Sequence, residues 1–205
     1  MRGTTKTAAQ TDTGVWDRLK KLALKKNQPF NVTIELTQKC NWKCVHCYNF
    51  DRTQLDFKKN SAEELSYTEQ LSLIDDLASA GCFVLTFTGG EVLLYPHLID
   101  LVKRARGYHL NVGLKSNGSL FSEEKFIELA ALGVQRLDLS LYGARPETHD
   151  AFTKMPGSFE KTLEAARLAQ EFAWRLRLNI ALHQDNYLEA EEMLMLAESY
   201  DASVG

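Results

Sequence analysis

From residue 31 onwards, short apolar runs typical of strands alternate with longer segments whose apolar residues recur at helical spacing. Val32, Ile34 and Leu36 repeat with a period of two, which is the pattern of a strand with one buried face. The five predicted strands are Val32–Leu36, Phe83–Phe87, Leu110–Leu114, Arg136–Leu141 and Arg175–Leu182. Five strand–helix units in succession predict an α/β fold, a parallel sheet with helices packed outside it.

Helix boundaries follow from capping residues. Ser66 and Glu69 have the spacing of a capping box, and Pro96 and Ser122 open the next two predicted helices. Two further helices are predicted over Ser158–Phe172 and Asn186–Tyr200, and a short basic one over Trp16–Lys26. The lysines of this basic segment predict either a solvated face or a surface that grips an acidic leader peptide.

The chain divides into a lead, residues 1–30, which includes the basic helix, and a core, residues 31–205. With 205 residues and 44% hydrophobic content, the chain is long enough for one well-buried domain. It stops at Gly205, where a sixth strand would begin. We therefore expect five units with the sixth strand missing, which would leave the fifth strand as an exposed edge.

Three cysteines, Cys40, Cys44 and Cys47, lie within eight residues, directly after the first predicted strand. Three thiolates so close together form a compact ligand set for a metal centre, and they favour an iron–sulfur cluster with one open position. A closed zinc site usually needs four protein ligands. The alternative is therefore a zinc-stabilised binding module without catalysis, with His46 as the fourth ligand. Cys82 lies in an apolar run and is expected in the core.

Polar or glycine-rich segments follow the other four strands as well. In parallel barrels the chemistry collects at the carboxyl ends of the strands, so these segments are expected on one edge of the sheet. They are Gly89-Gly90-Glu91, Ser116-Asn117, Ser140 and Asn179. The two glycines carry no Cβ and let backbone approach a ligand closely, and Glu91 offers an acceptor for a cation.

The spacing of Cys40, Cys44 and Cys47 resembles the CxxxCxxC signature of the radical SAM superfamily, and Thr88–Glu91 resembles its GGE motif. The runs Ser140–Gly143 and Pro146–Asp150 resemble the branch that carries a SPASM or twitch domain. That branch includes maturases of ribosomal peptides, sulfatase-activating enzymes and haem-pathway enzymes. The resemblance implies a partial (β/α) TIM-like barrel of radical SAM type.

The resemblance also implies a [4Fe–4S] cluster on the three cysteines, which are then the catalytic and metal-binding residues, and S-adenosyl-L-methionine on the open iron. The cofactor-binding residues that it implies are His46, Tyr48, Gly89, Gly90, Glu91, Ser116, Asn117, Ser140 and Asn179. Among these, His46 would lie near the adenine and Glu91 would bind the methionyl ammonium. Tyr142 is a departure, because many relatives have Asp at this position.

The implied reaction is hydrogen abstraction from a peptide or protein substrate, with a haem precursor as the alternative substrate. A one-electron donor such as flavodoxin or ferredoxin is the expected partner. The net charge of −3 gives no nucleic-acid footprint. No apolar run approaches a membrane span, and no signal peptide is visible, so we expect a cytoplasmic protein. No feature of the sequence predicts an oligomeric state.

Overall fold

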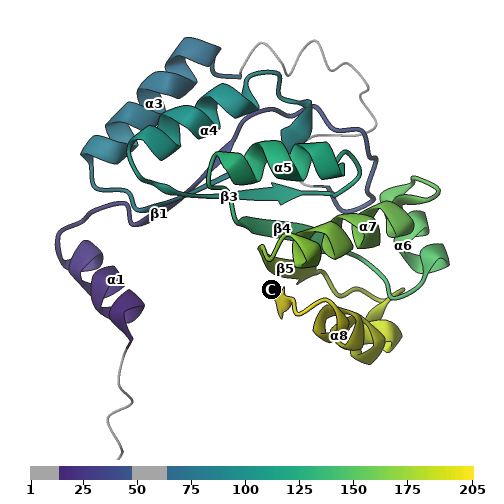
Figure 1. Ribbon diagram of the computed structural model, residues 1–205. Coiled ribbons are helices and arrows are strands. Elements are labelled where there is room, and N and C mark those ends of the chain that lie inside the picture. The colour runs from purple at the N-terminus through teal and green to yellow at the C-terminus, as the bar shows by residue number, and fades with distance from the viewer. Residues whose placement is uncertain (1–13, 48–63) are drawn as a thin grey trace, which may run out of the picture.

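The computed structural model describes residues 14–47 and 64–205, and within them the strand–helix alternation is confirmed (Figure 1). The helices are α1 (Val15–Lys25), α3 (Tyr67–Ser79), α4 (Leu98–Gly107), α5 (Glu123–Ala131), α6 (Pro146–Thr153), α7 (Ser158–Glu171) and α8 (Ala190–Ser199), with 3₁₀ turns η2 (Val92–Leu94) and η3 (Tyr187–Glu189). The strands are β1 (Asn31–Glu35), β2 (Val84–Thr88), β3 (Asn111–Ser116), β4 (Arg136–Leu141), β5 (Arg175–Ile180) and β6 (Ser203–Val204).

The strands form one parallel sheet in the order β1-β2-β3-β4-β5-β6. Sequential neighbours joined by helices give the winding of an open (β/α) barrel. Helices α3, α4, α5, α7 and α8 lie on one side of the curved sheet (Figure 1). The apolar strand residues, such as Leu85, Leu114 and Leu139, face these helices and are fully buried. The core therefore lies outside the sheet, and the inner face is left to polar residues.

The expectation that the sixth strand is missing was wrong. Ser203 and Val204 pair with Arg177 and Leu178 of β5, so β6 has begun before the chain stops. The N–H of Gly205 donates to the Leu178 carbonyl at 3.0 Å, and its carbonyl accepts from Ile180. The last residues are held because the free N–H and C=O groups of a sheet edge are satisfied by any strand that reaches them.

Capping explains where several helices begin. Ser66 and Glu69 form the predicted capping box at α3, and Ser122 caps α5. Helix α6 was not predicted, although Pro146 stands at its start, a favoured position for proline. At the next boundary, the Asp150 carboxylate accepts hydrogen bonds from the N–H groups of Gly157 and Phe159 at 2.6 and 2.9 Å. Asp150 thus fixes the start of α7 from the end of α6.

The basic helix predicted over Trp16–Lys26 is α1, and it meets the rest of the chain through one aromatic cluster. The Trp16 ring packs edge-on against Phe30 and Phe83, with centroids 5.9 and 5.5 Å away. Most other residues of the helix are exposed. Since Phe30 precedes β1 and Phe83 precedes β2, α1 lies at the amino ends of the strands, opposite the cysteines. No helix among the described residues is long and apolar enough to cross a membrane.

Candidate active site

The predicted meeting of the strand ends is found in a cavity of about 170 Å³ at the carboxyl edge of the sheet. All three cysteines of the motif line it. So do nearly all the other predicted residues: His46, Gly89, Gly90, Ser116, Asn117, Ser140 and Asn179. Glu91 is not among the lining residues, and Tyr48 lies outside the residues that the structure describes.

A hydrogen-bond network holds the cysteine loop against the turn after β3. Asn41 Nδ2 donates to Ser119 Oγ at 2.7 Å, and Asn117 Nδ2 donates to Asn41 Oδ1 at 2.9 Å. Ser119 closes the network by donating from its N–H and its hydroxyl to Asn117 Oδ1 at 2.9 and 2.6 Å. The amide of Asn117 is therefore used to position the loop. Local sequence patterns do not reveal this role, because 76 residues separate Asn117 from Asn41.

Two donors reach the sulfur of Cys40. The Trp42 N–H lies 3.4 Å from this Sγ, and Asn117 Nδ2 lies 3.9 Å away. Such N–H···S contacts stabilise a thiolate and tune the potential of a metal cluster bound to it.

Gly89 and Gly90 allow close packing of backbone on backbone. A Cβ on Gly89 would lie 2.4 Å from the Thr37 carbonyl oxygen, and one on Gly90 would lie 2.3 Å from the Lys39 carbonyl oxygen. The Gly90 N–H donates to the Thr37 carbonyl at 2.7 Å, and Gly89 has a φ of +150°. These glycines line the cavity, and they also let the turn after β2 lie directly against the start of the cysteine loop.

Glu91 does not line the cavity, and its side chain is buried, at 1% exposure. Its carboxylate accepts from Ser116 Oγ and the Asn117 N–H, both at 2.8 Å, and from the Leu93 N–H at 3.1 Å. Burial raises the pKa of Glu91, and these three donors lower it in part. The visible role of this side chain is to tie the turn after β2 to the end of β3. Its predicted contact with a cofactor ammonium stays a prediction.

An aromatic wall covers one side of the cysteine loop. His46 packs against Tyr142 and Phe152, with ring centroids 4.7 and 4.5 Å away, and Tyr142 stacks on Phe152 at 4.5 Å. Burial raises the pKa of Tyr142, which therefore stays a neutral phenol. Trp42 and Cys44 are buried in the same cluster. This wall excludes water from one flank of the thiols.

Helix α6 supplies Phe152 to this wall and forms hydrogen bonds directly to the loop. The N–H groups of Lys43 and Val45 donate to the carbonyls of Thr153 and Phe152 at 3.1 and 2.9 Å. His149, on the same helix, is fully buried, and its Nδ1 accepts from the Tyr142 N–H at 3.2 Å.

Sequence reasoning missed Lys115, Asp138 and Thr88, which also line the cavity. Lys115 and Asp138 are register partners on β3 and β4. Burial raises the pKa of Asp138, and the charges of Arg136, Lys115 and Arg177 lower it in part. The alternation along β4 was the available signal, because Asp138 and Ser140 must face the same side of a strand.

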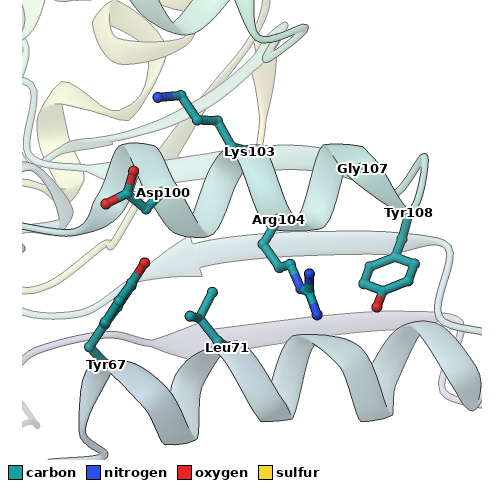
Figure 2. Close-up of a pocket in the computed structure, with 7 residues that line it drawn as sticks. All are labelled: Tyr67, Leu71, Asp100, Lys103, Arg104, Gly107 and Tyr108. Atoms are coloured by element: carbon teal, nitrogen blue, oxygen red, sulfur yellow. The ribbon is translucent and has the colours of Figure 1, made fainter.

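A larger groove, of about 690 Å³, lies between α3 and α4 (Figure 2). Arg104 and Tyr108 point from α4 toward α3 there, and Tyr67 and Leu71 come from α3. The Arg104 guanidinium forms a paired contact with Asp75 at 2.6 and 2.7 Å. The groove holds none of the predicted site residues, so size does not mark the active site in this chain.

The donor set of the smaller cavity fits an iron–sulfur cluster. It offers three soft thiols and a partly enclosed space beside them. In the described part of the chain, no three His, Cys, Asp or Glu side chains converge as they would around a single metal ion. The three thiols instead line one shared cavity.

Comparison with known proteins gives the family. The sequence profile of the Radical SAM superfamily matches residues 34–197. The chain belongs to the radical SAM superfamily. It is 35% identical over 176 residues to the AdoMet-dependent heme synthase of Methanosarcina barkeri, covering 86% of this chain and 49% of that protein. It is 30% identical over 177 residues to a mycofactocin maturase of Mycobacterium tuberculosis, covering 86% and 44%.

These relatives are consistent with the branch that the sequence predicted, and the radical SAM chain spans about half of their length. Among solved structures, Streptococcus suis SuiB bound to S-adenosylmethionine superposes with a TM-score of 0.69 at 15% identity, covering 100% of this chain and 46% of that one. This likeness confirms the predicted partial-barrel fold.

Proposed function

We propose that this chain is the core of a radical SAM enzyme in which Cys40, Cys44 and Cys47 hold a [4Fe–4S] cluster. The observation that carries the proposal is the single cavity that joins these thiols to the glycine turn after β2 and to the polar ends of β3, β4 and β5. When bound, the cluster and S-adenosyl-L-methionine supply a 5′-deoxyadenosyl radical that abstracts hydrogen from the substrate.

The protein's own residues orient the reactants and exclude water. Ser140 and Asn179 are register partners on β4 and β5 that both line the cavity, so their polar groups are placed to hold the cofactor. Gly89 and Gly90 offer backbone beside it. The wall formed by His46, Tyr142 and Phe152 covers one flank of the thiols, and excluding water there strengthens the electrostatic contacts on that side.

The proposed substrate is a peptide or protein, and the relation to a mycofactocin maturase supports it. A haem precursor is the second candidate, favoured by the 35% identity to an AdoMet-dependent heme synthase. The electron would come from a flavodoxin or ferredoxin, and the site of action would be the cytoplasm. Both rest on the same resemblance.

Anaerobic reconstitution with iron and sulfide tests this proposal. The reduced protein is expected to give an electron paramagnetic resonance signal that shifts when S-adenosyl-L-methionine is added. It is also expected to release 5′-deoxyadenosine. A colourless protein that takes up zinc and ignores the cofactor would establish the binding-module alternative. A cluster that does not respond to S-adenosyl-L-methionine would also refute the proposal.

A further inference from the structure

The inner face of the sheet carries a concentration of positive charge below the proposed cofactor site. Strand residues alternate between the two faces, and the apolar set faces the helices, so the polar set faces inward. A cavity of about 310 Å³ lies against this inner face. It is lined by Asn31, Thr33, Thr86, Lys115, Arg136, Asp138, Arg175, Leu176, Arg177 and Ser203.

Four of the lining side chains are cations: Lys115, Arg136, Arg175 and Arg177. Asp138 is the one carboxylate that lines this cavity. Glu35 on β1 is the register partner of Thr88 on β2, so its side chain also faces the inner side of the sheet. The four cations therefore exceed the carboxylates of the inner face among the described residues. Arg136 and Arg175 are register partners, which places two like charges on neighbouring strands.

Among the described residues, these cations form no close ion pair, although the charges of Arg136, Lys115 and Arg177 act on Asp138. Within the described part of the chain, the salt bridges within 4.0 Å involve none of Lys115, Arg136, Arg175 and Arg177. Arg136 is positioned by protein contacts, because Nη2 donates to Thr86 Oγ1 and the guanidinium lies over Gly113. Lys115, Arg175 and Arg177 are exposed among the described residues, and the Arg177 guanidinium lies beside Gly205.

The cationic cavity adjoins the cysteine-lined cavity. Lys115 and Asp138 line both. Arg177 precedes Asn179 by two residues on β5, and a strand rises about 3.3 Å per residue. Lys115 and Arg177 thus lie roughly 7 Å deeper in the barrel than the polar strand ends at the proposed cofactor site. Arg136 and Arg175, four residues before Ser140 and Asn179, lie roughly 13 Å deeper. A substrate molecule that reaches both cavities would present one part to each.

We propose that this inner cavity binds carboxylate groups of the substrate while the carbon that reacts lies in the cysteine-lined cavity above it. The inference rests on the proposed function and specifies its substrate as a molecule with several carboxylates. Guanidinium groups bind carboxylates through paired hydrogen bonds. A concave surface with like charges also focuses its field on an incoming anion. A bound polycarboxylate relieves the repulsion between Arg136 and Arg175.

Two carboxylate probes distinguish the possible sources of this chemistry. One is coproporphyrin III, a tetrapyrrole with four propionates, and the other is a fluorescently labelled hexaglutamate peptide. Their counterparts are a porphyrin with four cationic pyridinium groups and a labelled hexaglutamine. Dissociation constants are measured anaerobically on the cluster-loaded protein by fluorescence, at low and at raised salt. Cleavage of S-adenosyl-L-methionine is measured separately on the same samples.

At least one carboxylate probe is expected to bind more tightly than its counterpart, with an affinity that falls as salt is raised. Arg177→Gln and Arg175→Gln should each weaken binding about tenfold, because each removes a charge-assisted contact. Arg177→Lys keeps the charge and should recover part of the loss. Lys103→Gln, in the groove between α3 and α4, is the matched control and should bind like the wild type. Thermal melting establishes that each variant is folded. If Arg177→Gln does not fold, Arg175→Gln alone provides the binding test.

Binding of the porphyrin alone would assign a tetrapyrrole-type substrate, and binding of hexaglutamate alone an acidic peptide. The inference is overturned if neither probe binds better than its counterpart, or if both arginine variants bind as tightly as the wild type. Intact cofactor cleavage in that case would leave the proposed function standing. Carboxylate binding without cofactor cleavage would instead count against the proposed function.

Discussion

The hydroxyl of Ser116, at the end of β3, donates a 2.8 Å hydrogen bond to the carboxylate of Glu91, on the turn after β2. The adjacent Asn117 N–H donates to the other carboxylate oxygen at the same distance. One buried acid thus joins two of the strand ends that form the cavity. The GGE segment therefore positions the end of β3 through the buried Glu91 carboxylate, while Gly89 and Gly90 line the cavity.

Replacing Glu91 with Gln should destabilise the fold by about 1–3 kcal/mol, because an amide NH₂ would face a donor and leave it unsatisfied. Denaturant unfolding measures the loss. Glu128→Gln, which removes an exposed ion pair with Lys125, is the control and should change stability by less than about 1 kcal/mol. Equal effects of the two substitutions would contradict the positioning role of Glu91.

The same acid predicts a pH dependence. Burial raises the pKa of Glu91 above its ordinary 4.5. Between 4.5 and the higher folded-state value, the folded protein binds a proton that the unfolded chain has released. This contribution to stability is therefore lost as the pH rises through that interval. Unfolding curves of the wild type and Glu91→Gln, compared from pH 4.5 upward, should differ in slope, and parallel curves would refute the assignment.

His149 has the opposite linkage, because burial lowers its pKa from 6.5 to about 4. Between these values the unfolded chain binds a proton that the folded protein does not, so stability should fall as the pH drops from 6.5 to 4. His149→Asn keeps an acceptor near the position of Nδ1 and should flatten this dependence. The exposed His109→Asn is the matched control and should keep the wild-type slope.

Substitution of the turn glycines should be severe. Gly89→Ala or Gly90→Ala places a Cβ against a backbone oxygen of the cysteine loop, which cannot move aside as a flexible side chain would. We expect a loss of about 3 kcal/mol in each case, with reduced iron uptake. Gly107→Ala has nothing within 4 Å of the added carbon and should be neutral or stabilising by up to about 1 kcal/mol. Iron content and thermal melting report both effects.

The cysteines give the most direct test of the metal centre. Cys40→Ala, Cys44→Ala and Cys47→Ala should each lose most of the iron and the brown colour after reconstitution. Cys82→Ala should load like the wild type, since its thiol is buried in the core and donates to the Val84 carbonyl. Full iron content in any of the three motif variants, measured by metal analysis, would refute the ligand assignment.

The sequence by itself determined the elements and the edge of the sheet on which the chemistry lies. Alternation in β1 and the capping box at Ser66 are local patterns, with periods and spacings that a few residues define. Parallel strands joined by helices must bring their carboxyl ends together, so the cysteine motif, the glycine turn and Ser140 could be placed in one site before any coordinates.

The tertiary structure alone decided which way the side chains of that site point. The bond from Ser116 to Glu91 spans 25 residues, and the one from Asn41 to Ser119 spans 78. Local periodicity contains no information on such pairs. The same holds for Lys115 and Arg177. In the sequence they look like ordinary surface charges, and only the folded sheet brings them to one cavity. Burial and charge at a site depend on what the rest of the chain brings to it, and only the folded chain fixes that.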